Sequence, residues 1–256
     1  MKTSHTDREW EKWGRRNPYL GVLGFETQSV LTDSTWREKF FGSGEEHIAR
    51  IISTAEAHFG PITPNRALDF GCGVGRLLMP LSNRFKEVCG VDISSSMLEQ
   101  ARTNLSSRPH VNLVRTLDDA AGEFDFVHSS IVLQHIRPQQ GMGLINRLLQ
   151  ITAPGGIFAL HTTIGDLRWK RRMLNMMRYR VRPVHWVYNI VRRRPLNEPI
   201  TEMNRYDAAA LFDLYRSIAD EPLVVQTIDQ DRYVGLMVIG RASDKRRGGE
   251  RTPTAD

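Results

Sequence analysis

Three closely spaced glycines follow an acidic residue in the stretch LDFGCGVGRLL, and a second acid follows further along the chain. Gly71, Gly73 and Gly75 alternate with other residues between two apolar runs. Glycine has no Cβ, so this spacing indicates a backbone that turns sharply and lets another group approach closely. Asp92 lies near the end of the apolar run EVCGVDI. A carboxylate there can accept the hydroxyl hydrogens of a ribose, so the pattern predicts a site for a nucleotide-like ligand.

The glycine spacing argues against two other kinds of nucleotide site. A dinucleotide site prefers G-x-G-x-x-G, but position 76, where the third glycine would stand, is Arg76. No phosphate-binding lysine accompanies the loop, so a nucleoside triphosphate is not expected. A tight turn without any ligand is the alternative interpretation. Asp92 and the surrounding strand–helix pattern argue against it.

Alternating strands and helices must position these residues. Strands are expected at 66–71, 87–93, 110–116, 124–133 and 155–163, and helices at 74–83, 94–105 (capped by Ser94) and 138–151. Such alternation predicts an α/β fold with a doubly wound, Rossmann-like sheet. A further helix at 206–216 precedes strands at 222–228 and 232–240. We therefore expect about seven strands, mostly parallel, ending in an antiparallel hairpin.

The rest of the chain is expected to surround this domain. Residues 1–42, with several aromatic side chains, predict a helical N-terminal lid. The main domain is expected at 43–241, opening with a helix that Ser43 caps in a Ser-x-x-Glu capping box. A basic insertion at about 166–205 is expected to form a cap of two helices, the second after Pro183. The polar residues 242–256 predict a disordered tail.

Composition excludes several classes of protein. No run approaches the roughly 18 apolar residues of a membrane span, and the polar N-terminus has no signal-like apolar core. Two cysteines among 256 residues give neither a disulfide framework nor a thiolate metal site. We therefore expect a cytoplasmic protein without a metal. The oligomeric state is not predicted.

The net charge of +6 is concentrated in the basic insertion. Residues 167–197 contain ten Lys or Arg side chains and no acidic one. Three interpretations remain open: a core-covering cap with a solvated basic face, a site for an anionic acceptor, or contact with an anionic membrane surface through 167–194. Nucleic acid is an unlikely partner because no recognition module accompanies the charge.

The sequence resembles the class I S-adenosylmethionine-dependent methyltransferases of the small-molecule type. The resemblance rests on LDFGCGVGR, GVDISSSML and FDFVHSSIVLQHI and covers about residues 43–163. It implies S-adenosyl-L-methionine as cofactor. It also implies a role for ten residues: Asp69, Gly71, Cys72 and Gly73 at the methionine end, Asp92 at the ribose, Ile93, Met97, Leu117 and Asp118 around the adenine, and Ser129 near the sulfonium.

The acceptor is less well defined by sequence. The fourth strand ends in HSSIVLQHI and lacks the Asn/Asp-Pro-Pro-Tyr run of enzymes that methylate planar nitrogens. We therefore favour O-methylation of a small polar, anionic or glycan-derived acceptor, with His135 or His161 as candidate base. The alternative interpretation for each of them is a hydrogen-bonded histidine with a structural role only, which is the role expected for His128. Two further hypotheses are a lipid-linked acceptor at a membrane surface and a catalytically silent cofactor-binding partner protein.

Overall fold

A computed structural model describes residues 5–23, 35–166, 182–191, 202–219, 222–230 and 233–244. Parts of the predicted lid, the first predicted cap helix and residues 245–256 of the predicted tail lie outside the described residues.

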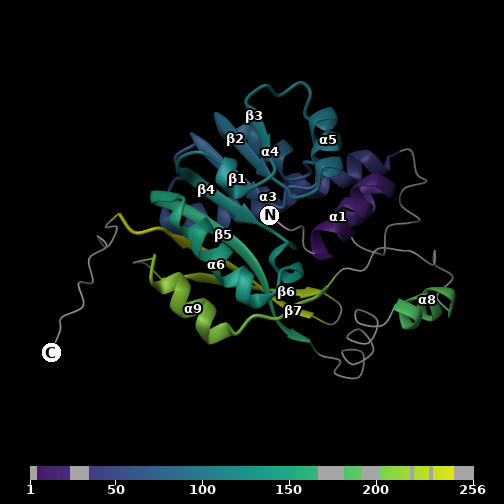
Figure 1. The fold of residues 1–256 in the computed structure, drawn as a ribbon. Coiled ribbons are helices and arrows are strands. Elements are labelled where there is room, and N and C mark those ends of the chain that lie inside the picture. Colours follow the sequence, from purple (N-terminus) through teal and green to yellow (C-terminus); the bar gives the residue numbers. More distant parts are fainter. Residues whose placement is uncertain are drawn as a thin grey trace.

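The strands form one sheet in the order β3-β2-β1-β4-β5-β7-β6 (Figure 1). They are β1 (Arg66–Phe70), β2 (Glu87–Val91), β3 (Val111–Val114), β4 (Phe124–Ser129), β5 (Thr152–Asp166), β6 (Val224–Gln230) and β7 (Tyr233–Arg241). Strands β1 to β5 pair in parallel, whereas β7 pairs antiparallel with both β5 and β6. The predicted fold class is confirmed. Because β1 leads to β2 on one side and neighbours β4 on the other, a crevice forms where the strand order reverses, the usual ligand site of such sheets.

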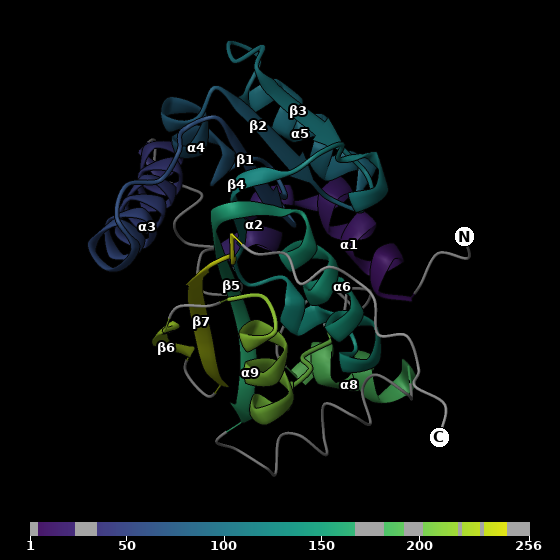
Figure 2. The same cartoon turned by 90° about the vertical axis from the view of Figure 1, so that its left-hand side faces the viewer.

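Helices cover both faces of the sheet. They are α1 (His5–Arg16), α2 (Pro18–Leu23), α3 (Trp36–Phe59), α4 (Leu78–Arg84), α5 (Ser95–Asn104), α6 (Pro138–Gln150), α8 (Arg182–Val191) and α9 (Ala208–Arg216), with short 3-10 turns at Leu117–Asp119 and Leu133–His135. Successive strand residues pack on opposite faces. Ala67 and Phe126 share a core cluster with residues of α3, α4 and α5, and Leu68 and Val127 share one with residues of α6 and α9. Figure 2 shows α3 and α4 on one side of the sheet and α6 and α9 on the other.

Several element boundaries differ from the prediction: α4 begins four residues later than predicted, at Leu78, and β5 extends beyond the predicted 155–163 at both ends. Helix α3 begins at Trp36, so Ser43 lies inside it and donates its hydroxyl hydrogen to the carbonyl of Phe40 instead of capping. The helix extends backward because Trp36 and Phe40 pack on Tyr19 of α2. Strand β4 ends at Ser129, short of the predicted residue 133, because Ile131 turns the chain with a φ of 61°.

Other boundaries agree with the sequence. Ser94 caps α5 as predicted, since its side chain accepts a hydrogen bond from the N–H of Met97. The predicted tail begins later than residue 242, because Ala242 is buried and pairs with Gly155 and Gly156 through backbone hydrogen bonds. The described end of the chain is thus part of the folded domain up to residue 244.

Candidate active site

The glycine loop after β1 adopts the conformation that its sequence suggested. Gly71, Gly73 and Gly75 have φ values of 77°, 52° and 86°, which side chains with a Cβ rarely adopt. The N–H of Gly71 donates to the carbonyl of Val91 at 2.7 Å, so the loop folds toward the end of β2. A Cβ on Gly71 would also overlap Val132 from the loop after β4. The glycines therefore bring β1, β2 and β4 close together at their carboxyl ends.

Asp92, just beyond β2, faces this loop. Its two carboxylate oxygens accept hydrogen bonds from the N–H groups of Gly73 (2.8 Å) and Ser94 (2.9 Å). Each oxygen keeps a lone pair for a further donor. Burial raises the pKa of Asp92 to about 6, despite those two donors. A ribose that donates its two hydroxyl hydrogens would fit this carboxylate.

A chain of buried polar side chains runs behind the glycine loop. Oδ1 of Asp69 lies 2.8 Å from Nδ1 of His128, and Nε2 of His128 lies 3.2 Å from Nε2 of His47 on α3. Arg76 is also buried here, and its Nε has no hydrogen-bond partner among the described residues. Burial lowers the pKa of Arg76, and the charge of Asp69 opposes that shift. The carboxylate of Asp69 is thus held by His128 and neutralised from nearby by Arg76.

Helix α1 attaches to the cofactor side of the crevice through Glu11. Its carboxylate accepts hydrogen bonds from the hydroxyls of Ser94 (2.8 Å) and Ser96 (2.7 Å) and from the N–H of Ser96 (3.3 Å). Burial alone would raise the pKa of Glu11, but these donors and Arg15 lower it to about 2. A negative charge at the N-terminus of α5 is also favourable to the helix dipole. The charged carboxylate of Glu11 therefore joins the lid by hydrogen bonds to the residues next to Asp92.

The same lid reaches the opposite side of the crevice through Trp10. The ring of Trp10 meets that of His135 edge to face, with centroids 5.0 Å apart. Trp13 is buried in one cluster with Val74 and Met97, and Val22 of α2 lies close to Gly73. Helices α1 and α2 thus cover the carboxyl ends of the strands.

The structure distributes the remaining predicted cofactor residues between interior and surface. Met97, Leu117 and Ser129 are buried, and Ser129 donates to the carbonyl of Phe70 at 3.0 Å. Ile93 is exposed, and Asp118 is exposed and paired with Arg147 of α6. Gly71, Gly73 and Asp92 therefore meet at the crevice, Asp69 and Ser129 are buried behind it, and Asp118 is on the rim.

Cys72 lies in the loop but is not suited to nucleophilic chemistry. Its side chain is buried, and its Sγ occupies the space that a Cβ on Gly90 would need. Burial raises the pKa of the thiol well above its ordinary value. A thiol that stays protonated is a poor nucleophile, so Cys72 acts here as a small packing residue.

His135 has the geometry of a potential base. Its Nδ1 lies 2.7 Å from the carbonyl oxygen of Glu202, which can only accept, so Nδ1 carries the hydrogen. Nε2 of the neutral ring is therefore an acceptor, and it is held by a side chain and not by the backbone. The nearest recorded partner of Nε2 is the side-chain amide of Gln134 at 3.4 Å. Burial lowers the pKa of His135 to about 4, so the ring is neutral at pH 7.

His161 has the opposite arrangement. Its Nδ1 accepts the N–H of Ile131 at 3.3 Å, so the hydrogen of the neutral ring is on Nε2. Nε2 is buried against Gly235 of β7, where a Cβ would overlap it, and has no partner among the described residues. Burial lowers its pKa to about 4. Because the lone pair of Nδ1 is bonded to this backbone N–H, His161 is not arranged to take a proton from a methyl-accepting hydroxyl. Its hydrogen bond instead supports the left-handed backbone of Ile131.

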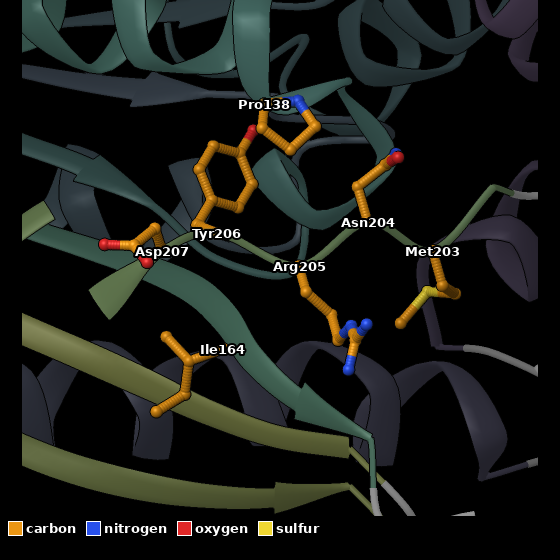
Figure 3. Close-up of a pocket in the computed structure, with 7 residues that line it drawn as sticks. All are labelled: Pro138, Ile164, Met203, Asn204, Arg205, Tyr206 and Asp207. Carbon is orange, nitrogen blue, oxygen red and sulfur yellow. The ribbon is translucent and has the colours of Figure 1, made fainter. Parts of the chain in front are cut away.

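Segment 202–207 lies beside the loop after β4 and borders a cavity of about 420 Å³. The hydroxyl of Tyr206 donates to the carbonyls of Leu133 (2.9 Å) and Ile136 (3.0 Å). The backbone N–H of Asn204 donates to the carbonyl of Gln134. The cavity is lined by Pro138, Ile164, Met203, Asn204, Arg205, Tyr206 and Asp207. Figure 3 shows Tyr206 pointing toward Pro138 and Arg205 pointing to the other side of the segment. Tyr206 is thus a buried packing residue.

A second cavity of about 390 Å³ lies at the other edge of the sheet. Its lining includes Arg66, Glu87 and Val111, which begin β1, β2 and β3. Ligands of doubly wound sheets bind at the carboxyl ends of strands, so this cavity is not the expected site. Among the described residues, no group of three or more His, Cys, Asp or Glu side chains is placed to hold a metal ion.

Comparison with known proteins identifies the family. A family model described as a methyltransferase domain matches residues 42–198, more than half of the chain. The chain belongs to this methyltransferase domain family. Together with the fold, this confirms the resemblance to class I methyltransferases, whose methyl donor is S-adenosylmethionine.

Individual relatives match over shorter regions. An uncharacterized methyltransferase from Synechocystis is 35% identical over 96 residues, 37% of this chain and 45% of the relative. Trans-aconitate 2-methyltransferase from Methylobacterium radiotolerans is 32% identical over 132 residues, 49% of this chain and 48% of the relative. The chain therefore spans about half the length of the curated relatives it matches.

A solved structure supports the fold. The N-methyltransferase NodS from Bradyrhizobium japonicum, in complex with S-adenosyl-L-homocysteine, is similar with a TM-score of 0.59. The similarity covers 93% of this chain and 99% of NodS at 14% sequence identity. At that identity it shows the fold alone.

Several residues at the site were not predicted from sequence. Glu11, His47 and Glu202 contact Ser94, His128 and His135 from distant parts of the chain, and Gln134 contacts its neighbour His135. Only the aromatic side chains of the lid carried a signal, since Trp10 and its neighbours predicted a covering helix. The contacts of Glu11, His47 and Glu202 depend on tertiary packing.

Proposed function

We propose that this protein is an S-adenosylmethionine-dependent methyltransferase that methylates a hydroxyl oxygen of a small polar, anionic acceptor. The carrying observation is the arrangement of Asp92 and His135 at the carboxyl ends of β2 and β4, with α1 contacting both sides through Glu11 and Trp10. A carboxylate suited to a ribose thus shares one covered crevice with a histidine whose accepting nitrogen meets only the side-chain amide of Gln134, at 3.4 Å. The cytoplasmic location expected from the two cysteines, both free and buried, is part of this proposal.

The residues present fit the cofactor. Asp92 would hold the ribose hydroxyls, the glycine loop and Asp69 would border the methionine end, and Met97 and Leu117 would border the adenine. When bound, S-adenosylmethionine supplies an electrophilic methyl group on a sulfonium. The contribution of the chain is to align the acceptor oxygen with that methyl group and to exclude water, which α1 and α2 do by covering the crevice.

His135 is the base in this proposal. A hydroxyl acceptor loses its proton as its oxygen forms the new bond to carbon, and Nε2 of His135 accepts that proton. The Nδ1–H of the ring stays bonded to the Glu202 carbonyl, which fixes the ring orientation and stabilises the positive charge that develops. The lone pair of His161 accepts a backbone N–H, which cannot rotate away as the side-chain amide of Gln134 can, so the role of His161 is to support Ile131.

The cavity beside segment 202–207 is the proposed acceptor site. It adjoins the loop that holds His135, because Pro138 and Asn204 line it and Asn204 donates to Gln134. Arg205 brings an exposed guanidinium to its wall. A guanidinium pairs well with a carboxylate or phosphate, which favours an anionic acceptor.

A labelled-methyl transfer assay tests the proposal. Hydroxy acids, phenolic acids and sugar phosphates are offered together with their neutral esters or parent alcohols. We expect transfer to an anionic acceptor, with a higher KM in Arg205→Gln but not in the control Arg216→Gln on α9. We also expect kcat about 100-fold or more lower in His135→Gln and near normal in His161→Gln. Tight S-adenosyl-L-homocysteine binding without transfer to any acceptor would instead identify a catalytically silent partner protein.

A further inference from the structure

Helix α8 exposes an apolar face that no described residue covers. Trp186 is 48% exposed, Val187 60%, Ile190 62% and Val191 75%. At 100° per residue, these four positions fall within one side of the helix. Figure 1 shows α8 set apart from the sheet. Large apolar side chains exposed together, unlike single ones, indicate an interaction surface.

The chain next to this face is strongly basic. Arg192, Arg193 and Arg194 follow Val191 directly, and Arg178 and Arg180 come shortly before the helix. Arg182 is the first residue of α8, and Arg192 is the residue directly after its last. No acidic residue occurs between 167 and 197. The partner of this surface must therefore be anionic and must also accept aliphatic and aromatic side chains.

We propose that α8 binds the surface of an anionic lipid bilayer. Its apolar face would enter the boundary between headgroups and acyl chains, and the flanking arginines would lie among the anionic headgroups. A tryptophan is well suited to that depth. No described helix is long and apolar enough to cross a membrane, and the ten residues of α8 span only about 15 Å. The helix therefore lies along the surface. This inference does not depend on the proposed reaction.

Two other occupants fit less well. Nucleic acid would attract the arginines, but its phosphate backbone offers no apolar layer for Val187 and Ile190. A second copy of the chain would bring two basic segments together. The face of a helix about 15 Å long and 10 Å wide is also far smaller than the roughly 800 Å² per partner of a stable interface.

Flotation of the full chain with vesicles tests the proposal. We expect binding to vesicles of phosphatidylcholine mixed with phosphatidylglycerol, weaker binding at high salt, and little binding to phosphatidylcholine alone. The double variant Val187→Ser with Ile190→Ser should bind the anionic vesicles at least about tenfold more weakly. Val225→Ser changes an equally apolar, exposed side chain on β6 and should bind like the wild type. Because all three side chains are exposed, none of these changes should alter the melting temperature.

A second variant and two further measurements separate the alternatives. Replacing Arg192, Arg193 and Arg194 by glutamine should also weaken vesicle binding. Brominated lipids should quench wild-type fluorescence more than that of Trp186→Phe. Equal vesicle binding by the wild type and the double serine variant overturns the proposal, as does no binding at low salt. Tight binding to heparin or duplex DNA with no vesicle binding, or a dimer abolished by Ile190→Ser, would identify a different partner and overturn it too.

Discussion

The two sides of the crevice between β1 and β4 are held together in different ways. On the cofactor side, Asp92 is fixed by the N–H groups of Gly73 and Ser94, which belong to the adjacent loops. On the acceptor side, His135 is fixed by the carbonyl of Glu202, 67 residues away in sequence. Tyr206 likewise joins segment 202–207 to the loop after β4. Local backbone geometry thus builds the cofactor side, whereas contacts between distant segments build the acceptor side.

This difference has a consequence for how each side can vary. The cofactor side depends on glycines with positive φ and on one carboxylate, which few substitutions can replace. The acceptor side depends on backbone carbonyls of residues 133, 136 and 202, which almost any residue supplies. Its side chains can therefore change while the frame that holds His135 stays.

Replacing Asp92 should produce the largest effect. In Asp92→Asn, one side-chain oxygen must replace two that accept from Gly73, Ser94 and the ribose hydroxyls. Charged hydrogen bonds contribute about 1.5–3 kcal/mol each, so we expect S-adenosyl-L-homocysteine to bind about 100-fold more weakly in calorimetric titration.

Asp118→Asn provides the matched control for that change. Asp118 has the same side chain but is 72% exposed on the rim and paired with Arg147. Exposed ion pairs contribute less than about 1 kcal/mol, so binding should change by less than about threefold. Equal losses in the two variants would show that the ribose is not held by Asp92.

Acid should destabilise the protein from an unusually high pH, because three histidine rings are buried as neutral groups and only one carboxylate, Asp92, offsets them. Burial lowers the pKa of His135 and His161 to about 4 and that of His47 to about 2, so these rings bind protons mainly in the unfolded chain below about pH 6.5. Burial raises the pKa of Asp92 to about 6, so Asp92 binds a proton first in the folded chain. With three histidines protonated mainly in the unfolded chain and Asp92 protonated mainly in the folded one, the unfolded state binds about two more protons than the folded state near pH 5.5.

The free energy of unfolding should therefore fall by about 2 kcal/mol per pH unit between pH 6.5 and 5. Urea titrations at several pH values measure this slope. His47→Gln removes one of the three histidines and should make the slope shallower. A free energy of unfolding that is constant over this range would contradict the burial of the three rings as neutral groups.

How far sequence predicts each side follows from the same contrast. The glycine loop, Asp92 and the Ser94 cap could be predicted because backbone conformation and short spacing determine them. The sequence named both His135 and His161 as candidate bases. The proposed preference for His135 depends on tertiary contacts, because Nδ1 of His135 meets the carbonyl of Glu202 whereas Nδ1 of His161 meets the N–H of Ile131. The start of α3 was predicted too late because its first turn is stabilised by α2 rather than by a cap.

The same change at two tyrosines compares the two sides directly. Tyr206→Phe removes a buried hydroxyl that donates to the carbonyls of Leu133 and Ile136, and should lower the free energy of unfolding by about 1–2 kcal/mol. Tyr19→Phe removes a half-buried hydroxyl that donates to Asn104, and should cost less than about 1 kcal/mol. Thermal unfolding measures both. A larger loss at Tyr19 would mean that the lid, and not segment 202–207, stabilises the domain.

The smallest expected effects come from two neighbouring residues of α1 that contact opposite sides. Glu11→Gln removes the charge that links α1 to Ser94 and Ser96, so the lid should open more often and S-adenosyl-L-homocysteine should bind about three- to tenfold more weakly. Trp10→Leu removes the ring over His135 and leaves Glu11 in place. Its affinity for S-adenosyl-L-homocysteine should stay within about twofold, while the pKa of His135, followed by NMR, should rise toward its ordinary value as water reaches the ring. If Trp10→Leu instead weakens binding as much as Glu11→Gln, the lid closes as one rigid unit and the two sides of the crevice are not independent.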